Sequence, residues 1–182
     1  MTQELITKLQ EGNQRFIEGK NTVHNLIENR LKYVDNQKPY AVILSCSDSR
    51  VPSEMIFDAT LGDLFIIRVA GNIVAPSIVG SIEYAITNLD VKLVIVMGHT
   101  KCGAVDATIN SIANNIKPQS SNVQDIIDRI KPSIIEIVKC PELSLDKKKE
   151  MCIRSNIHAS VNHLKHASRI IENKVLNEDL TI

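Results

Sequence analysis

The chain has 182 residues, of which 43% are hydrophobic and 23% are charged. This length and balance are typical of one globular domain with a buried core. Its 21 basic and 21 acidic residues give a formal net charge of zero, so the charge favours neither a nucleic-acid partner nor an acidic tail.

No membrane or secretion signal is evident in the sequence. The N-terminal segment lacks the apolar core of a signal peptide. The longest apolar runs, such as Ala41–Leu44 and Leu93–Met97, are far shorter than the ~20 residues that cross a bilayer. We therefore expect a cytoplasmic protein with no membrane partner. In such a compartment the four cysteines favour metal binding or catalysis over a disulfide framework.

The first 36 residues predict an N-terminal helical arm. Apolar residues recur at helical spacing over residues 3–19, which predicts an amphipathic helix. Residues 22–37 are polar and are expected to form a second arm or a loop.

Residues 37–182 predict an α/β core. Short continuous apolar runs over residues 40–46, 64–70 and 92–98 are typical of buried parallel strands. A helix is expected over residues 77–89, between the second and third strands. This alternation predicts a central, mainly parallel β-sheet flanked by helices.

Beyond Thr100 the pattern becomes helical. We expect helices over residues 105–116 and 124–138 and one long helix over residues 150–173. The sequence has no internal repeat and no convincing linker. We therefore expect residues 1–182 to form a single domain.

Metal-competent residues follow two of the predicted strands. Cys46, Asp48 and Arg50 come after the first strand, and they would share one side of an extended chain. His99 and Cys102 come after the third strand, and they would share one face of a helix. Ligands of open parallel sheets bind at the carboxyl ends of the strands, so the two groups can converge on one point.

Two thiolates and an imidazole suit Zn²⁺, with a fourth position left for water or for Asp48. Gly98 and Gly103 flank the second group and leave room for a metal or a small ligand. Each group alone is a weak signal, because Cys46 could be a buried apolar residue and His99 a structural histidine. Without the cysteine, Asp48 and Arg50 would be interpreted as a salt bridge.

The complete set of motifs resembles the β-carbonic anhydrases. C-x-D-x-R and H-x-x-C enclose the stretches R-V-A-G-N and S-I-E-Y-A, and the match is densest over residues 8–110. The resemblance implies a lyase that reversibly hydrates carbon dioxide to bicarbonate and a proton through zinc-bound hydroxide. It makes Cys46, His99 and Cys102 the zinc ligands and Asp48 with Arg50 a catalytic dyad.

The resemblance also implies a substrate pocket and an assembly. The pocket residues would be Gln37, Val51, Phe65 and Tyr84, with Gly103 beside them. Members of the family form homodimers or higher homo-oligomers in which N-terminal helices embrace the partner subunit. They also continue into further strands near residues 180–182, so the final edge strands of this sheet are expected to be truncated.

Two features refine the expected zinc site. Members that close the site carry a tryptophan where this chain has Ile43, although Arg68 matches the arginine of the same regulatory pocket. We therefore expect the open subtype, with water on zinc and Asp48 binding it only in a closed state. The alternatives are a non-catalytic structural zinc protein and a hydrolase of CS₂ or COS on the same scaffold.

Overall fold

The computed structural model describes residues 2–22 and 25–182. At its centre, β1 (Ala41–Ser45), β2 (Leu64–Arg68) and β3 (Val94–Met97) form a parallel sheet in the order β2–β1–β3. Each strand lies within one of the apolar runs that predicted it. The predicted parallel sheet is therefore confirmed.

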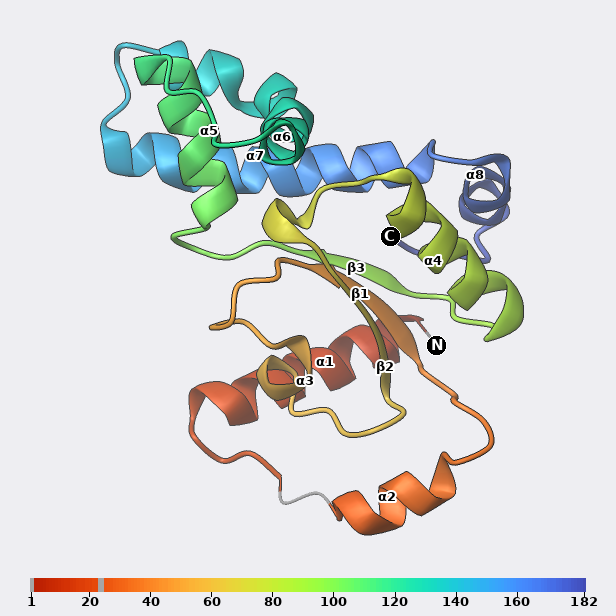
Figure 1. The fold of residues 1–182 in the computed structure, drawn as a ribbon. Coiled ribbons are helices and arrows are strands. Elements are labelled where there is room, and N and C mark those ends of the chain that lie inside the picture. The colour runs from red at the N-terminus through yellow and green to blue at the C-terminus, as the bar shows by residue number, and fades with distance from the viewer. Residues whose placement is uncertain (1, 23–24) are drawn as a thin grey trace.

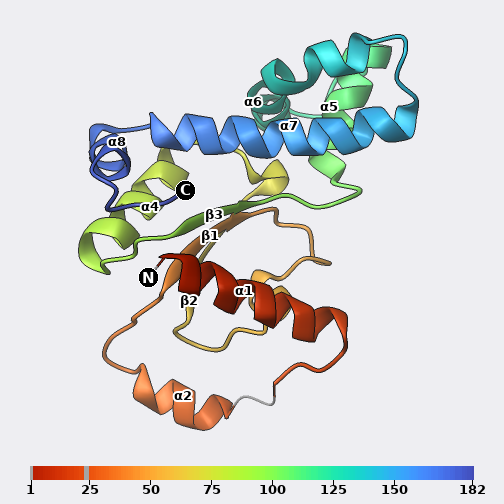
Figure 2. The ribbon, with the colours of Figure 1, turned by 180° about the vertical axis from the view of Figure 1, so that it is seen from behind.

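Helices connect the strands and cover both faces of the sheet. They are α1 (Thr2–Ile17), α2 (Leu26–Lys32), α3 (Ser53–Ile56), the 3-10 turn η1 (Ala70–Asn72), α4 (Pro76–Asn88), α5 (Gly103–Asn114), α6 (Ser121–Lys139), α7 (Leu145–Lys165) and α8 (Arg169–Leu176). The first three lie on one side of the sheet, and α4 to α8 lie on the other (Figures 1 and 2). None of the described helices is long and apolar enough to cross a membrane.

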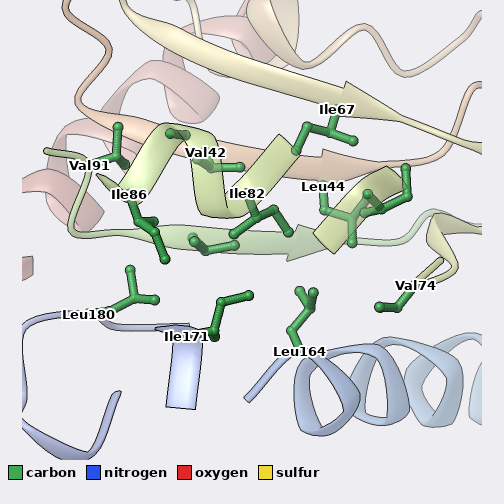
Figure 3. Packing of buried hydrophobic residues seen from close by; sticks show 13 residues of the cluster. Val42, Leu44, Ile67, Val74, Ile82, Ile86, Val91, Leu164, Ile171 and Leu180 are labelled. Atoms are coloured by element: carbon green, nitrogen blue, oxygen red, sulfur yellow. The ribbon is translucent and has the colours of Figure 1, made fainter. Parts of the chain in front are cut away.

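The burial of the central strand β1 explains why it is apolar from Ala41 to Leu44. Successive side chains of a strand point to opposite faces, and every residue of β1 is buried. Val42 and Leu44 join the core under α4, α7 and α8, which Figure 3 shows from close by. Ala41 and Ile43 join the smaller core under α1 instead, where they pack with Leu9.

The C-terminal helical region differs from the prediction. The prediction of a single helix over residues 150–173 is wrong, because α7 ends at Lys165 and α8 begins at Arg169. Ser144 caps the start of α7, and its Oγ accepts a hydrogen bond from Lys147 N at 3.4 Å. Ser168 caps α8 in the same way through Ile171 N at 3.3 Å. A serine that accepts such a bond favours a new helix start over continuation of the preceding helix.

Two other segments complete the comparison. The polar segment expected over residues 22–37 contains α2, while Val23 and His24 lie outside the described residues. At the far edge of the sheet, Thr181 pairs with Leu93 in a parallel bridge. The residues at which a further strand was expected therefore lie beside β3.

Candidate metal centre

Three potential metal ligands converge at the carboxyl ends of β1 and β3. The ligand atoms of Cys46, His99 and Cys102 all lie within 4.8 Å of one another, and the two sulfur atoms are 3.9 Å apart. A tetrahedral zinc site with Zn–S bonds of about 2.3 Å places its sulfurs about 3.8 Å apart. The observed spacing therefore fits zinc.

The imidazole of His99 is oriented for metal binding. Its Nδ1 lies 2.9 Å from the Thr100 carbonyl oxygen, and a carbonyl only accepts, so Nδ1 carries the proton. Its Nε2 is buried and has no hydrogen-bond partner within the described part of the chain. A buried lone pair without a partner is costly. A cation between Nε2 and the two sulfurs would satisfy it.

A turn, and not an extended segment, places Asp48 beside the cluster. The strand β1 ends at Ser45, and Val51 N donates a hydrogen bond to Asp48 O at 3.1 Å, which closes a turn. The chain is therefore not extended over residues 46–50, which was the condition for Cys46, Asp48 and Arg50 to share one side. The turn still brings Asp48 Oδ2 to 3.9 Å from His99 Nε2.

A turn also joins His99 to Cys102, so the condition for a shared helical face is not met. The helix α5 begins only at Gly103, and Cys102 is its N-cap residue. Lys101 turns the chain before it, with a left-handed φ of 57°. The two ligands meet because the chain reverses between β3 and α5.

The neighbouring thiols of Cys46 and Cys102 shift each other's pKa in opposite directions. The hydrogen bond from Cys102 lowers the pKa of Cys46, and the backbone N–H of Gly71 adds to this effect against the cost of burial. The pKa of Cys102 is raised, because its proton is held by the Cys46 sulfur and burial disfavours a second charge. A divalent cation would replace that proton and stabilise both thiolates.

The pair formed by Asp48 and Arg50 is bidentate. Arg50 Nε donates to Asp48 Oδ1 at 2.9 Å and Nη2 donates to Oδ2 at 2.8 Å. These bonds hold the pKa of Asp48 well below its usual value. Arg50 Nη2 also donates to the Lys101 carbonyl at 3.0 Å, which ties the dyad to the turn that carries His99.

Two features that the sequence interpretation missed support the cysteine loop. Arg68, at the end of β2, donates to the backbone carbonyls of Cys46 at 2.9 Å and Asp48 at 2.5 Å. Gly71 in η1 donates its N–H to Cys46 Sγ at 3.4 Å. The stretch R-V-A-G-N carried both residues as a family signature, but neither spacing nor residue type indicated these contacts.

The expected pocket residues fall into two groups. Val51 packs against the core cluster that contains Cys46 and Cys102, and Gly103 follows Cys102 directly. Phe65 pairs with Val42, at the other end of the strands. Val42 is four residues before Cys46, so Phe65 lies about 13 Å from the level of Cys46 along the strand direction.

The second group also includes Tyr84 and Gln37. The Tyr84 ring contacts the Phe65 ring at a centroid distance of 6.3 Å and is half exposed. Gln37 is exposed and precedes the amino end of β1. The single chain therefore does not bring Gln37, Phe65 and Tyr84 to the metal centre.

Two further residues have packing roles. A side chain at Gly98 would place its Cβ 2.7 Å from Ile157 Cδ1 of α7, so the missing side chain serves the approach of α7 to β3. Ile43, at the position of the expected regulatory tryptophan, is fully buried in the core under α1.

A parallel sheet flanked by helices, with a Cys–His–Cys cluster at its carboxyl edge that could hold a metal ion, defines an α/β protein with a candidate metal site. A sequence model of the family described as carbonic anhydrase matches residues 41–182. Carbonic anhydrase 2 of Mycobacterium tuberculosis (strain ATCC 25618 / H37Rv) is 43% identical over 128 residues, which are 70% of this chain and 61% of that protein. The carbonic anhydrase of Helicobacter pylori (strain J99 / ATCC 700824) is 30% identical over 156 residues, 80% of this chain and 70% of that protein.

Solved structures agree with the sequence comparison. The β-carbonic anhydrase CcaA matches with a TM-score of 0.73 and 27% identity, over 97% of this chain and 86% of that chain. A structure described as one of two tetrameric β-carbonic anhydrases from Sordaria macrospora matches with a TM-score of 0.73 and 21% identity, over 97% of this chain and 88% of that chain. The chain therefore belongs to the β-carbonic anhydrase family. It spans about three fifths of the length of the mycobacterial relatives.

Proposed function

We propose that this chain catalyses the reversible hydration of carbon dioxide to bicarbonate and a proton, with Zn²⁺ held by Cys46, His99 and Cys102. One observation carries the proposal. Three ligand atoms within 4.8 Å of one another lie beside a carboxylate that Arg50 holds by two hydrogen bonds. A purely structural zinc site has no need for an arginine that restrains a neighbouring carboxylate.

The zinc ion would supply a Lewis acid that lowers the pKa of a bound water toward neutrality. We assign the fourth position to water, which is the open subtype. Arg50 supports this assignment, because it engages both Asp48 oxygens. A carboxylate that left Arg50 for the metal would lose both of these charge-assisted bonds.

Asp48 would orient the nucleophile. Its pKa lies well below the usual value, because Arg50 donates to it, so the side chain is ionised at neutral pH. An ionised carboxylate only accepts hydrogen bonds. Asp48 can therefore take a proton-donating contact from a reactant at the metal, and Arg50 fixes the direction of its lone pairs.

We assign the recognition of carbon dioxide to a small apolar lining. Val51 and Gly103 lie next to the ligands and offer little polar surface. Carbon dioxide is small and apolar, so it needs few directed contacts. CS₂ and COS share this chemistry, and direct assays of the three substrates would distinguish them.

The assembly is proposed to be a homodimer or a higher homo-oligomer. Tyr84 is 49% exposed beside the edge strand β2, and α2 exposes an apolar strip that includes Leu26, Ile27 and Leu31. Pairing of two copies at this edge could bring Phe65 and Tyr84 of one protomer toward the metal centre of the other. The Sordaria macrospora enzymes are described as tetrameric, and sedimentation equilibrium of this protein tests the assembly directly.

A reducing compartment such as the cytoplasm is proposed as its location. All four cysteines are free, and disulfides are rare in the cytoplasm.

The decisive experiment is stopped-flow measurement of CO₂ hydration over pH 6.5–9 together with a zinc assay. We expect about one zinc per chain. Because two thiolate ligands neutralise the metal charge, a bound water would lose its proton less readily, and we expect the hydration rate to rise above neutral pH. A zinc-replete protein without activity at any of these pH values would instead support the structural zinc protein.

A further inference from the structure

The helix α7 reaches the metal centre through two buried polar side chains. Asn156 and Ser160 are 3% and 5% exposed and lie four residues apart, which places them on one face of α7. Asn156 Nδ2 donates to the Gly71 carbonyl at 2.8 Å, and Ser160 Oγ donates to the Asn72 carbonyl at 3.0 Å. The single turn η1 is therefore attached to α7 by two hydrogen bonds, and α7 runs above the yellow segment near residue 71 in both views (Figures 1 and 2).

The same turn contacts a metal ligand on its other side. Gly71 N donates to Cys46 Sγ at 3.4 Å. Gly71 thus receives a hydrogen bond from α7 at its carbonyl and gives one to the sulfur at its N–H. A shift of this residue away from α7 would change the bond to the sulfur.

The position of Gly71 is narrowly defined by its surroundings. Its φ is +69°, a conformation that glycine adopts without strain. A Cβ at this position would lie 2.8 Å from Ile130 Cδ1 and 3.0 Å from Ala104 Cβ. The turn therefore packs directly on α5 and α6, and the two bonds from α7 are its polar attachments on the remaining side.

We propose that Asn156 and Ser160 are positioning residues of the metal centre, which hold η1 so that Gly71 N–H donates to the Cys46 sulfur. This inference deepens the proposed function and rests on its metal centre, but it does not depend on turnover. Neither residue belongs to the ligand set or to the dyad of Asp48 and Arg50.

The physical consequence concerns the metal–sulfur bond. A hydrogen bond to a thiolate lowers the energy of the sulfur lone pairs. It also helps to hold the sulfur in place for binding. Loss of contacts around the primary ligands commonly weakens metal affinity by 10–100-fold.

The test uses the full chain with Co²⁺ in place of zinc, because the thiolate-to-cobalt charge-transfer band reports the energy of the sulfur lone pairs. In Asn156→Ala and Ser160→Ala we expect this band to move to longer wavelength. We also expect zinc affinity, measured by chelator competition, to fall by about tenfold. A band and an affinity that stay at the wild-type values in folded variants would overturn the proposal.

Ser155→Ala is the matched control. Ser155 lies on the same helix, and its Oγ donates to the Ser133 carbonyl at 2.6 Å, so it binds α6 and not η1. We expect this variant to lose some thermal stability but to keep the band and the affinity. A band shift in Ser155→Ala equal to that in Ser160→Ala would reduce the effect to general loosening of α7 and would overturn the proposal.

A second measurement needs no variant. In the wild-type protein loaded with ¹¹³Cd, the bond from Gly71 to Cys46 predicts a through-bond correlation between the metal and the Gly71 amide proton. Its absence would overturn the proposal even if both α7 variants fail to fold. Because none of these readouts uses CO₂, a protein that gives the expected spectra without hydrating CO₂ would refute the proposed function and leave this inference intact.

Discussion

Asp48 and Arg50 form a pair whose geometry is fixed from two sides. The guanidinium engages both carboxylate oxygens, at 2.9 and 2.8 Å, and also the Lys101 carbonyl at 3.0 Å. The same aspartate lies 3.9 Å from the free nitrogen of His99. Arg50 therefore restrains a carboxylate that is close enough to compete for the metal.

Replacement of Arg50 by alanine tests this relationship. We expect Arg50→Ala to retain zinc but to hydrate CO₂ about 100-fold more slowly, because Asp48 loses its orientation and can approach the metal. Stopped-flow rates on protein of measured zinc content provide the comparison. Arg154→Ala is the control, since Arg154 is an exposed arginine that pairs only with Glu150 among the described residues. Wild-type turnover in zinc-replete Arg50→Ala would contradict the role assigned to the dyad.

Removal of one cysteine tests the ligand set. We expect Cys46→Ser to bind less than one tenth of the zinc that the wild type binds, because a serine hydroxyl is a much poorer zinc ligand than a thiolate. Cys140→Ser serves as the control, since Cys140 lies outside the cluster and its Sγ donates a hydrogen bond to the Glu142 carboxylate. Zinc analysis after dialysis measures both variants. Equal zinc content in the two would exclude Cys46 as a ligand.

Removal of the metal should also destabilise the wild type. A ligand that binds only the folded state at 100 times its dissociation constant adds about 2.7 kcal/mol to the free energy of unfolding. We therefore expect a chelator to lower the melting temperature of the wild type and to leave that of Cys46→Ser nearly unchanged. An equal decrease in both proteins would point to an effect of the chelator unrelated to this site.

The sheet and the ligand set could be predicted from the sequence for a physical reason. A strand buried on both faces is largely apolar, so β1 was visible as the run of apolar residues over 40–44 that leads to Cys46. The carboxyl ends of parallel strands share one edge, so the sequence indicated that Cys46 and His99 can converge, and the order β2–β1–β3 makes their strands neighbours. These conclusions needed only local pattern and topology.

The sequence could not show how the chain turns after each strand. The positive φ of Lys101 and the turn closed at Asp48 depend on hydrogen bonds within the loops, and hydrophobic periodicity carries no information about them. The attachment of Asn156 to Gly71 joins residues 85 positions apart. Two polar residues four apart on a helix are as typical of a solvated face as of a buried contact, so no local signal distinguished them.

A buried ion pair near the N-terminus predicts how stability depends on pH. The Asp58 side chain is 2% exposed and accepts hydrogen bonds from Arg15 at 2.6 Å and from Thr22 Oγ1 at 2.7 Å. Burial alone would raise the pKa of Asp58, but these bonds outweigh it and hold the pKa well below the usual value of 3.8. The pair joins α1 to the end of α3.

The sign of the pH effect follows from this depressed pKa. The unfolded state binds the Asp58 proton first as the pH falls, so the stabilisation is complete well above pH 3.8 and is lost progressively below it. We expect Asp58→Asn to unfold about 2 kcal/mol more easily than the wild type at pH 7, and the difference to shrink below pH 4. Denaturant unfolding at several pH values measures it. Asp90→Asn is the control, because Asp90 is 83% exposed, and a deficit of Asp58→Asn that stayed constant down to pH 2 would refute the assignment.

The contact between β3 and α7 gives a final prediction, about packing. A Cβ at Gly98 would lie 2.7 Å from Ile157 Cδ1 and 2.8 Å from Ile157 Cγ1, so we expect Gly98→Ala to lower the free energy of unfolding by about 1–3 kcal/mol. Ile157→Ala removes both contacting atoms, so in that background the added methyl group should cost little. Gly80→Ala is the matched control, since nothing lies within 4 Å of its Cβ position on α4, and it should be neutral or slightly stabilising. If Gly98→Ala is equally harmful with and without Ile157, a contact other than the one with Ile157 determines the requirement for glycine, and the prediction is wrong.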